Sequence, residues 1–229
     1  MTDLLSNPIW HSLSTCHSDL AMGNHLAKRY PEDMGPLSGI PEQSEESWEA
    51  LKALMLPNQH SVLFLNEPAR CEAGLTITVQ FPLEQMICRF SPCLSPSNVK
   101  VEVLAEADVP EMLALTKLTE PGPFRDRTIY LGGYCGIREQ GRLVAMAGRR
   151  TAIPGYKEVS AVCTHPSYRR RGYGAALVCA VSDRIVKDGG LPYLHVRQSN
   201  FSAISLYRRL GFEISRTFYC AVVVMDGTP

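Results

Sequence analysis

The segment from Glu158 to Ala175 constrains the fold more than any other part of the chain. An apolar run over residues 159–164 leads into a loop rich in arginine and glycine, and the pattern beyond it predicts a helix from about Gly172 to Lys187. The start of a helix carries unpaired backbone N–H groups and a partial positive charge, so it is suited to binding an anion. Gly172 and Gly174 would let the backbone approach a bulky anion, and the arginines at 169–171 add donors suited to phosphate. A buried strand that opens directly into an anion-binding helix start predicts an α/β fold.

Two better-known phosphate loops do not match this segment. A dinucleotide fingerprint would need a third glycine where the chain has Leu177, and an acidic residue near the end of the next strand, where it has Arg197. A P-loop would need Gly-Lys followed by Ser or Thr, which the sequence lacks. The loop therefore belongs to another kind of anion site.

From Lys100 onward the apolar spacing predicts strand, helix, three strands, helix, strand, helix and strand, in that order. We expect strands over 101–104, 134–138, 143–148, 159–164, 192–196 and 212–224, and helices over 108–118, 172–187 and 201–210. This order predicts a mixed α/β sheet with helices on its faces.

The first part of the chain is less regular. Its spacing predicts helices over His17–Tyr30 and Ser44–Met55, and strands over 61–65 and 75–81. The stretch Phe90–Asn98 contains two prolines and three serines and reads as a linker. We therefore predict a smaller α/β domain over residues 1–97 and a second domain over 98–229.

A second motif follows the loop after one intervening strand. The spacing Arg169-x-x-Gly172-x-Gly174 resembles the acyl-CoA loop of the GNAT N-acetyltransferase superfamily. The spacing Asn200-x-x-Ala203-x-x-Leu206-Tyr207-x-x-x-Gly211-Phe212 is similar to the other signature of that superfamily. The resemblance covers about residues 100–226. Within the superfamily, the sequence is most similar to the glycine-N-acyltransferase-like branch.

This resemblance implies a fold and an activity. The fold would be a GNAT-like mixed, mostly antiparallel sheet with helices on both faces. The activity would be transfer of an acyl group, most simply acetyl, from acyl-CoA to a primary amine, with acetyl-CoA as co-substrate and no metal. Residues 1–97 would cap the sheet or wall the acceptor side.

The resemblance also implies roles for individual residues. Main-chain groups of Val162, Cys163 and Thr164 would contact the pantetheine arm, Asn200 would contact the CoA arm, and Tyr207 would lie near the thioester sulfur. Glu158 falls where the histone-acetyltransferase branch places its general base. The residues that would hold the pyrophosphate are Arg169, Arg170, Arg171, Gly172, Tyr173, Gly174 and Ala175.

The chemistry of the residues agrees with these roles. Aminolysis of a thioester needs a neutral amine, so a carboxylate at the mouth of a strand, such as Glu158, could take the proton directly or through a water. The departing thiolate could be protonated by a nearby phenol such as Tyr207.

Each residue also has a plainer interpretation. Tyr207 shares an apolar stripe with Leu206 and Leu210 and could belong to the core, and Glu158 could be an ordinary charge at a strand end. His195 and His165 are alternative bases, while a nucleophilic role for Cys163 would need partners that the sequence does not offer. The whole chain could instead be a non-catalytic acyl-CoA sensor, a transferase with another carrier, or an RNA-binding protein.

The composition limits the classes of partner that the chain is expected to bind. Lys and Arg together number 23, as do Asp and Glu, so the formal charge is zero and a partner such as nucleic acid or an anionic membrane is disfavoured. The eight cysteines are scattered without a Cys-x-x-Cys pair, which favours free thiols and a reducing, cytoplasmic location. We expect acyl-CoA and an amine as partners, no membrane association, and a monomer or a homodimer.

Overall fold

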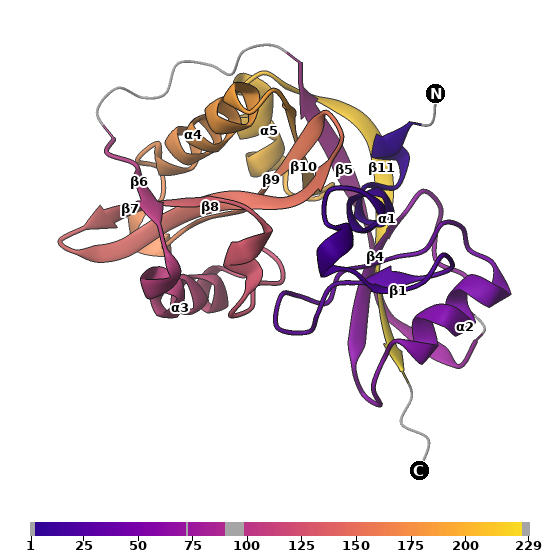
Figure 1. Cartoon of the computed structure of the whole chain (residues 1–229). Coiled ribbons are helices and arrows are strands. Elements are labelled where there is room, and N and C mark those ends of the chain that lie inside the picture. Colours follow the sequence, from indigo (N-terminus) through magenta and orange to yellow (C-terminus); the bar gives the residue numbers. More distant parts are fainter. Residues whose placement is uncertain (1–2, 72, 90–98, 226–229) are drawn as a thin grey trace.

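The structure is a computed structural model that describes residues 3–71, 73–89 and 99–225. Eight strands form one large sheet in the order β4-β11-β5-β10-β9-β8-β7-β6 (Figure 1). The strands are β4 (His60–Leu65), β5 (Leu75–Cys88), β6 (Glu102–Leu104), β7 (Tyr134–Glu139), β8 (Arg142–Ile153), β9 (Tyr156–Thr164), β10 (Leu191–Arg197) and β11 (Phe212–Met225). Neighbouring strands are antiparallel except β9 and β10, which are parallel. The expected mixed, mostly antiparallel sheet is confirmed.

Helices cover both faces of this sheet. α4 (Tyr173–Lys187) and α5 (Phe201–Arg209) lie on one face and α3 (Val109–Thr119) on the other (Figure 1). Apolar side chains of α4, among them Leu177, Val178 and Ile185, are buried against the sheet. This burial explains the apolar stripe that predicted the helix.

The first part of the chain adds a small sheet and two helices. The strands β1 (Met22–Gly23), β2 (Lys28–Arg29) and β3 (Ser38–Gly39) form the small sheet, and α1 (Pro8–Ser14) and α2 (Glu45–Ala53) flank it. α2 begins as the sequence predicts, because the Ser44 side chain accepts a hydrogen bond from the backbone N–H of Ser47.

The helix expected over His17–Tyr30 is wrong. This stretch forms a short 3-10 turn over Ser18–Leu20 and then the β1–β2 hairpin. Gly23 has φ +118°, and the Asn24 side chain accepts hydrogen bonds from the N–H groups of Leu26 and Ala27. A glycine and an asparagine in this arrangement make a tight turn, which outweighs the apolar spacing.

β5 belongs to the first part of the chain but lies among the strands of the second part in the large sheet. It is twice as long as the strand expected over 75–81, and it lies in the large sheet between β10 and β11. The sequence prediction ended early because Pro82 argues against a central strand. In the structure the carbonyl of Pro82 accepts from the N–H of Gln198, just beyond the end of β10, so the missing donor of the proline faces the end of that strand.

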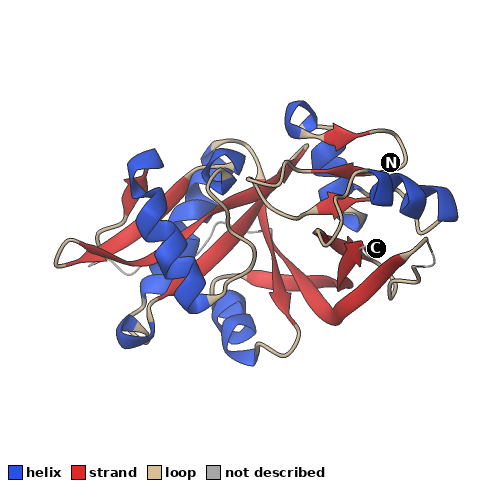
Figure 2. Cartoon of the chain, turned by 90° about the horizontal axis from the view of Figure 1, so that it is seen from below, coloured by secondary structure: helices blue, strands red, loops and turns tan. Residues whose placement is uncertain are grey.

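The boundary at residue 97 stays a prediction, because the stretch Phe90–Asn98 read as a linker lies outside the described residues. Strands on both sides of the boundary nevertheless hydrogen bond in one sheet. Figure 2 shows that the strands run through the whole width of the molecule.

A chain that begins at Asn98 is expected to fold poorly, since it would lack the strand that separates β10 from β11 and pairs with both. Circular dichroism and thermal unfolding of this truncated chain, beside the whole chain, measure the effect. A cooperative transition close to that of the whole chain would instead support an independent second domain.

Candidate functional site

The parallel strands β9 and β10 part in the middle of the sheet. Within the described strands their pairing stops at Glu158 and Tyr193, although β9 continues to Thr164 and β10 to Arg197. The far edge of β9 stays bonded to β8. The edge of residues 159–164 that faces β10 therefore presents backbone groups that another extended chain could bond.

β9 is irregular along this open edge. Its register with β8 shifts between Met146 and Gly148, and Ala161 has φ +53°. A non-glycine residue in this left-handed region marks a β-bulge that re-aims the local backbone, which is a common feature beside functional sites.

A cleft of about 1050 Å³ opens where the strands part. Its lining comes from the open stretch of β9, the end of β10, the loop before α4, one side of α5, and strands β4, β5 and β11. The cleft includes most of the residues predicted from the sequence, namely Val162, Cys163, Thr164, Arg169, Arg170, Gly172, Tyr173, Gly174, Ala175, Asn200 and Tyr207.

The loop before α4 has the geometry of an anion site. Gly172 lies at the N-cap with φ +80°, and Arg170 has φ +64°. The first helical hydrogen bond is donated by Ala176 to the Gly172 carbonyl, so the N–H groups at 173–175 have no partner within the helix. Left-handed residues next to free N–H groups are typical of backbone concavities that bind anions.

The arginines of this loop differ in their placement. Arg169 and Arg170 line the cleft, and Arg169 Nε lies 3.4 Å from the Thr164 carbonyl oxygen. Arg171 is not among the lining residues; its guanidinium carbon lies 5.0 Å from the centre of the Tyr168 ring. A phosphate contact predicted for the Arg171 side chain therefore has less support than one for Arg169 or Arg170.

α5 presents two residues to the cleft. Asn200 caps the helix, because its Oδ1 accepts from the N–H of Ala203 at 3.1 Å, which leaves its amide N–H groups for a ligand. Tyr207 is 8% exposed, and its hydroxyl has no partner among the described residues. Burial raises the pKa of Tyr207 to about 12, so the phenol keeps its proton at neutral pH.

Glu158 lies behind the wall of the cleft and is only 1% exposed. Its carboxylate accepts from Arg150 Nε at 3.0 Å and Nη2 at 2.6 Å, from the Thr151 hydroxyl at 2.7 Å and from His195 Nδ1 at 2.8 Å. Burial alone would raise the pKa of Glu158, but the charge of Arg150 and the contact with His195 outweigh it and hold the pKa well below its usual range. A carboxylate held in this way is a poor proton acceptor, so its surroundings do not favour the predicted role of general base.

Three comparisons with known proteins place the chain in a family. Residues 134–221 match the model of the FR47-like protein family. A crystal structure of a protein from Novosphingobium aromaticivorans, assigned to the GNAT family of acetyltransferases, is 35% identical, with a TM-score of 0.90 over 99% of this chain and 100% of the other. The chain belongs to the GNAT family.

Two further proteins are similar to this chain in sequence or in fold. The N-alpha-acetyltransferase RimI of Mycobacterium tuberculosis is 37% identical over 92 residues, which are 38% of this chain and 57% of that protein. A GCN5-related N-acetyltransferase from Kribbella flavida shares the fold, with a TM-score of 0.63 and 21% identity over 97% of this chain and 96% of the other. The chain thus aligns with little more than half the length of RimI. The glycine-N-acyltransferase-like branch stays a prediction.

The alternative catalytic residues have separate places in this GNAT fold. His195 lines the cleft, and its ring makes edge-on contacts with the rings of Phe64 and Phe218. Burial lowers the pKa of His195, while its contact with Glu158 opposes that shift. The Nε2 atom of His195 lies 3.3 Å from the amide nitrogen of Gln85. His165 is not a lining residue, and its Nδ1 accepts from the N–H of Ser167. Burial raises the pKa of Cys163 to about 11, which disfavours a thiolate nucleophile.

Sequence reasoning missed Arg150. The strand expected over 143–148 ends before it, whereas β8 continues to Ile153 and carries Arg150 to the cleft. Two adjacent arginines after an apolar run are typical of the solvated end of a strand. The only signal in the sequence was the alternation that continues through Thr151 and Ile153.

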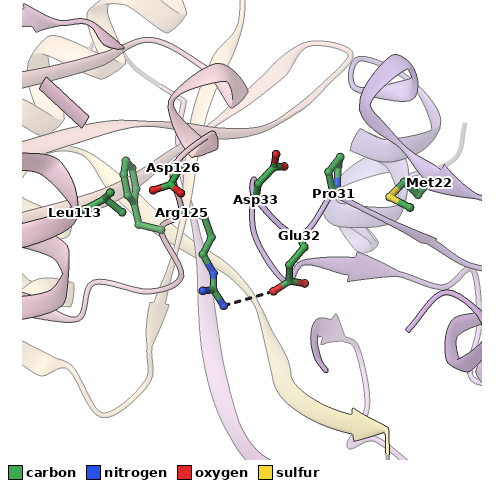
Figure 3. A pocket seen from close by; sticks show the side chains of 8 residues that line it. Met22, Pro31, Glu32, Asp33, Leu113, Arg125 and Asp126 are labelled. Carbon is green, nitrogen blue, oxygen red and sulfur yellow. Dashed lines mark ion pairs between the residues drawn. The ribbon is translucent and has the colours of Figure 1, made fainter. Parts of the chain in front are cut away.

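A second hollow, of about 590 Å³, lies between the loop at Pro31–Asp33 and the loop at Phe124–Asp126 (Figure 3). Arg125 and Glu32 approach to 3.6 Å across it, and Arg127 pairs with Asp33 at 3.2 Å. Among the described residues, no three His, Cys, Asp or Glu side chains are grouped to hold a metal ion, these carboxylates included. This hollow is a contact between two loops, and we assign it no function.

No helix of the described chain is long and apolar enough to cross a membrane.

Proposed function

We propose that this GNAT protein transfers an acyl group, most simply acetyl, from acyl-CoA to a primary amine by direct attack of the amine on the thioester. One observation carries the proposal: the open edge of β9, the loop at Gly172–Gly174 and Tyr207 all face a single cleft. An anion site, an extended backbone edge and a protonated phenol are features that such a transfer can use.

The residues around the cleft fit a CoA ester. The N–H groups at 173–175 and the side chains of Arg169 and Arg170 would bind the pyrophosphate. The free edge at Val162–Thr164 would bond the amide groups of the pantetheine arm, and the amide N–H groups of Asn200 would bond the same arm. An added Cβ at Gly174 would meet only the Leu206 side chain, at 3.6 Å, so the helix start is open to a ligand.

Tyr207 supplies the acid. Its hydroxyl has no partner among the described residues and keeps its proton at neutral pH, with a pKa of about 12. The amine would enter in its neutral form, and its nitrogen would form the C–N bond as the C–S bond breaks. Tyr207 would donate its proton to the departing thiolate, and the phenolate would then take the proton that the new amide nitrogen loses, which restores the phenol. Glu158 takes a positioning role in this proposal, because it holds Arg150 and His195 in the wall of the cleft. Much of the rate would come from holding the amine against the thioester.

Tyr207→Phe separates this chemistry from packing. The substitution keeps the ring and removes an unpartnered hydroxyl, so the free energy of unfolding should change by less than about 1 kcal/mol. The kcat should fall by roughly 100-fold while the Kd of CoA stays the same. A thiol-release assay with acetyl-CoA and an accepted amine measures kcat, and calorimetry measures the Kd. Unchanged kcat would assign Tyr207 to the core.

A further inference from the structure

Arg150 has one guanidinium nitrogen without a partner among the described residues. Its Nε and Nη2 bind Glu158, which leaves Nη1. The side chain is 12% exposed and lines the cleft, and its guanidinium carbon lies 5.4 Å from the centre of the Phe64 ring. Because the side chain lines the cleft, the unpaired Nη1 can bond whatever the cleft holds, water or a ligand.

Arg197 is a second cation in the same wall. Its guanidinium carbon lies 3.9 Å from the centre of the Phe81 ring, and no carboxylate pairs with it in the described part of the chain. Burial raises the pKa of the Cys220 thiol to about 11, and the charges of Arg150 and Arg197 both oppose that rise. In the register of the sheet, Phe64 of β4 and Phe81 of β5 lie on either side of Cys220 of β11, so the two stacked arginines lie over one cross-strand row of the cleft.

Little negative charge balances these two arginines. Arg169 and Arg170 belong to the proposed pyrophosphate loop, and Arg209 lies on α5. Among the described lining residues Glu120 is the only acidic side chain. Because Glu158 balances the charge of Arg150, the two arginines and Glu158 together carry a net charge of about +1, which favours one small anion rather than a polyanion.

The surface around these arginines is apolar and comes mostly from the first part of the chain. The apolar side chains that line it come from β4, β5, β11 and the segment just before β3, and they are Leu37, Val62, Phe64, Val79, Phe81, Leu83, Cys220 and Val222. This wall continues from the arginines along the cleft, so it suits a ligand with an anionic group next to an apolar body.

We propose that the acceptor is a small amine that carries a carboxylate and an apolar side chain, with the carboxylate bound by Arg150 Nη1 and Arg197. This inference rests on the proposed transferase function and names its substrate class. A protein N-terminus fits less well, because a peptide carries a neutral amide in place of the carboxylate.

A ligand that cannot be acylated tests the carboxylate site apart from catalysis. Calorimetry on the whole chain should show 3-phenylpropanoate binding about tenfold or more tightly than its neutral analogue 3-phenylpropanamide. Equal affinities would overturn the site whether or not the protein transfers acyl groups.

Three variants locate the binding. Arg197→Gln should weaken 3-phenylpropanoate about tenfold and leave 3-phenylpropanamide unchanged. Arg150→Lys keeps the charge beside Glu158 but loses the second donor, so it should weaken the same ligand. Arg149→Gln is the matched control, because Arg149 pairs with Asp188 at 2.6 Å and does not line the cleft. If Arg149→Gln weakened the binding of 3-phenylpropanoate equally, the effect would come from the net charge of the protein alone, and the proposal would be overturned.

Turnover distinguishes this inference from the proposed function. With acetyl-CoA, L-leucine and L-phenylalanine should have lower KM values than isopentylamine and 2-phenylethylamine, which lack the carboxylate. Acetylation of the plain amines, or of a short peptide, with equal or lower KM would overturn the carboxylate site and leave the transferase standing. Carboxylate binding without acetylation of any amine would instead refute the proposed function.

Discussion

Gly174→Glu is expected to fold at least as well as the natural chain and to lose CoA binding by about 100-fold or more. The added Cβ meets only Leu206, at an ordinary contact distance of 3.6 Å. A carboxylate in the first turn of α4 interacts favourably with the helix dipole, by about 0.3–1 kcal/mol. The same carboxylate would fill the proposed pyrophosphate site and repel its charge. The expected stability and binding effects thus have opposite signs, which thermal unfolding and calorimetry with CoA measure on the same sample.

Two further variants separate size from charge. Gly174→Ala adds the Cβ alone and should change the Kd of CoA little. Gly174→Gln has nearly the size of the glutamate variant without its charge, and its affinity should fall between the two. If all three variants bind CoA as the natural chain does, the pyrophosphate lies elsewhere.

Glu158→Gln is expected to lower the free energy of unfolding by about 3–5 kcal/mol. The substitution keeps the shape of the side chain but leaves the guanidinium of Arg150, 12% exposed, without its counter-ion. The double variant Glu158→Gln/Arg150→Met removes both charges and should recover part of the loss. Chemical denaturation of the single and double variants measures this coupling. Strictly additive losses would contradict a tight buried pair.

The pH dependence of stability follows from the same pair. The pKa of Glu158 is lowered on folding from its ordinary value of 4.5, so the unfolded chain binds a proton more readily. The stability that Glu158 contributes is complete above about pH 4.5 and is lost as the pH falls below it. The pKa of His195 is lowered from 6.5, which acts in the same direction. We expect the natural chain to lose stability below pH 4.5 more steeply than Glu158→Gln does. Parallel curves would contradict the lowered pKa of Glu158.

Local patterns predicted the helices and strands around the CoA loop because those residues carry their own signals. The loop at Arg169–Gly174 and the N-cap at Asn200 are contiguous in sequence, and their backbone conformations follow from residue type. The length of β5 was beyond such reasoning, since Pro82 is tolerated only because β10 ends beside it. The β1–β2 hairpin was missed because the apolar spacing was weighed above the Gly23–Asn24 turn.

The site shows the same limit. The residues that line the cleft from β9 to α5 could be named from two motifs, whereas the network of Arg150, Glu158 and His195 joins three strands. Glu158 was assigned a catalytic role because it falls where the histone-acetyltransferase branch places its general base. The contacts of Glu158 depend on how the strands pack in the sheet. They hold its carboxylate in a buried ion pair, where it is a poor base. Charge state in a protein interior depends on such distant partners more than on residue type.

The stoichiometry of acyl transfer tests the central claim most directly. The whole chain would be mixed with acetyl-CoA, first alone and then with an accepted amine, and the free thiol, the acetylated amine and the mass of the protein would be followed together. Direct transfer in the cleft between β9 and β10 predicts no thiol release and no acetylated protein until the amine is added, and then one thiol for each acetylated amine. Binding of acetyl-CoA without transfer to any amine, or a burst of thiol with an acetyl group left on the protein, would contradict it.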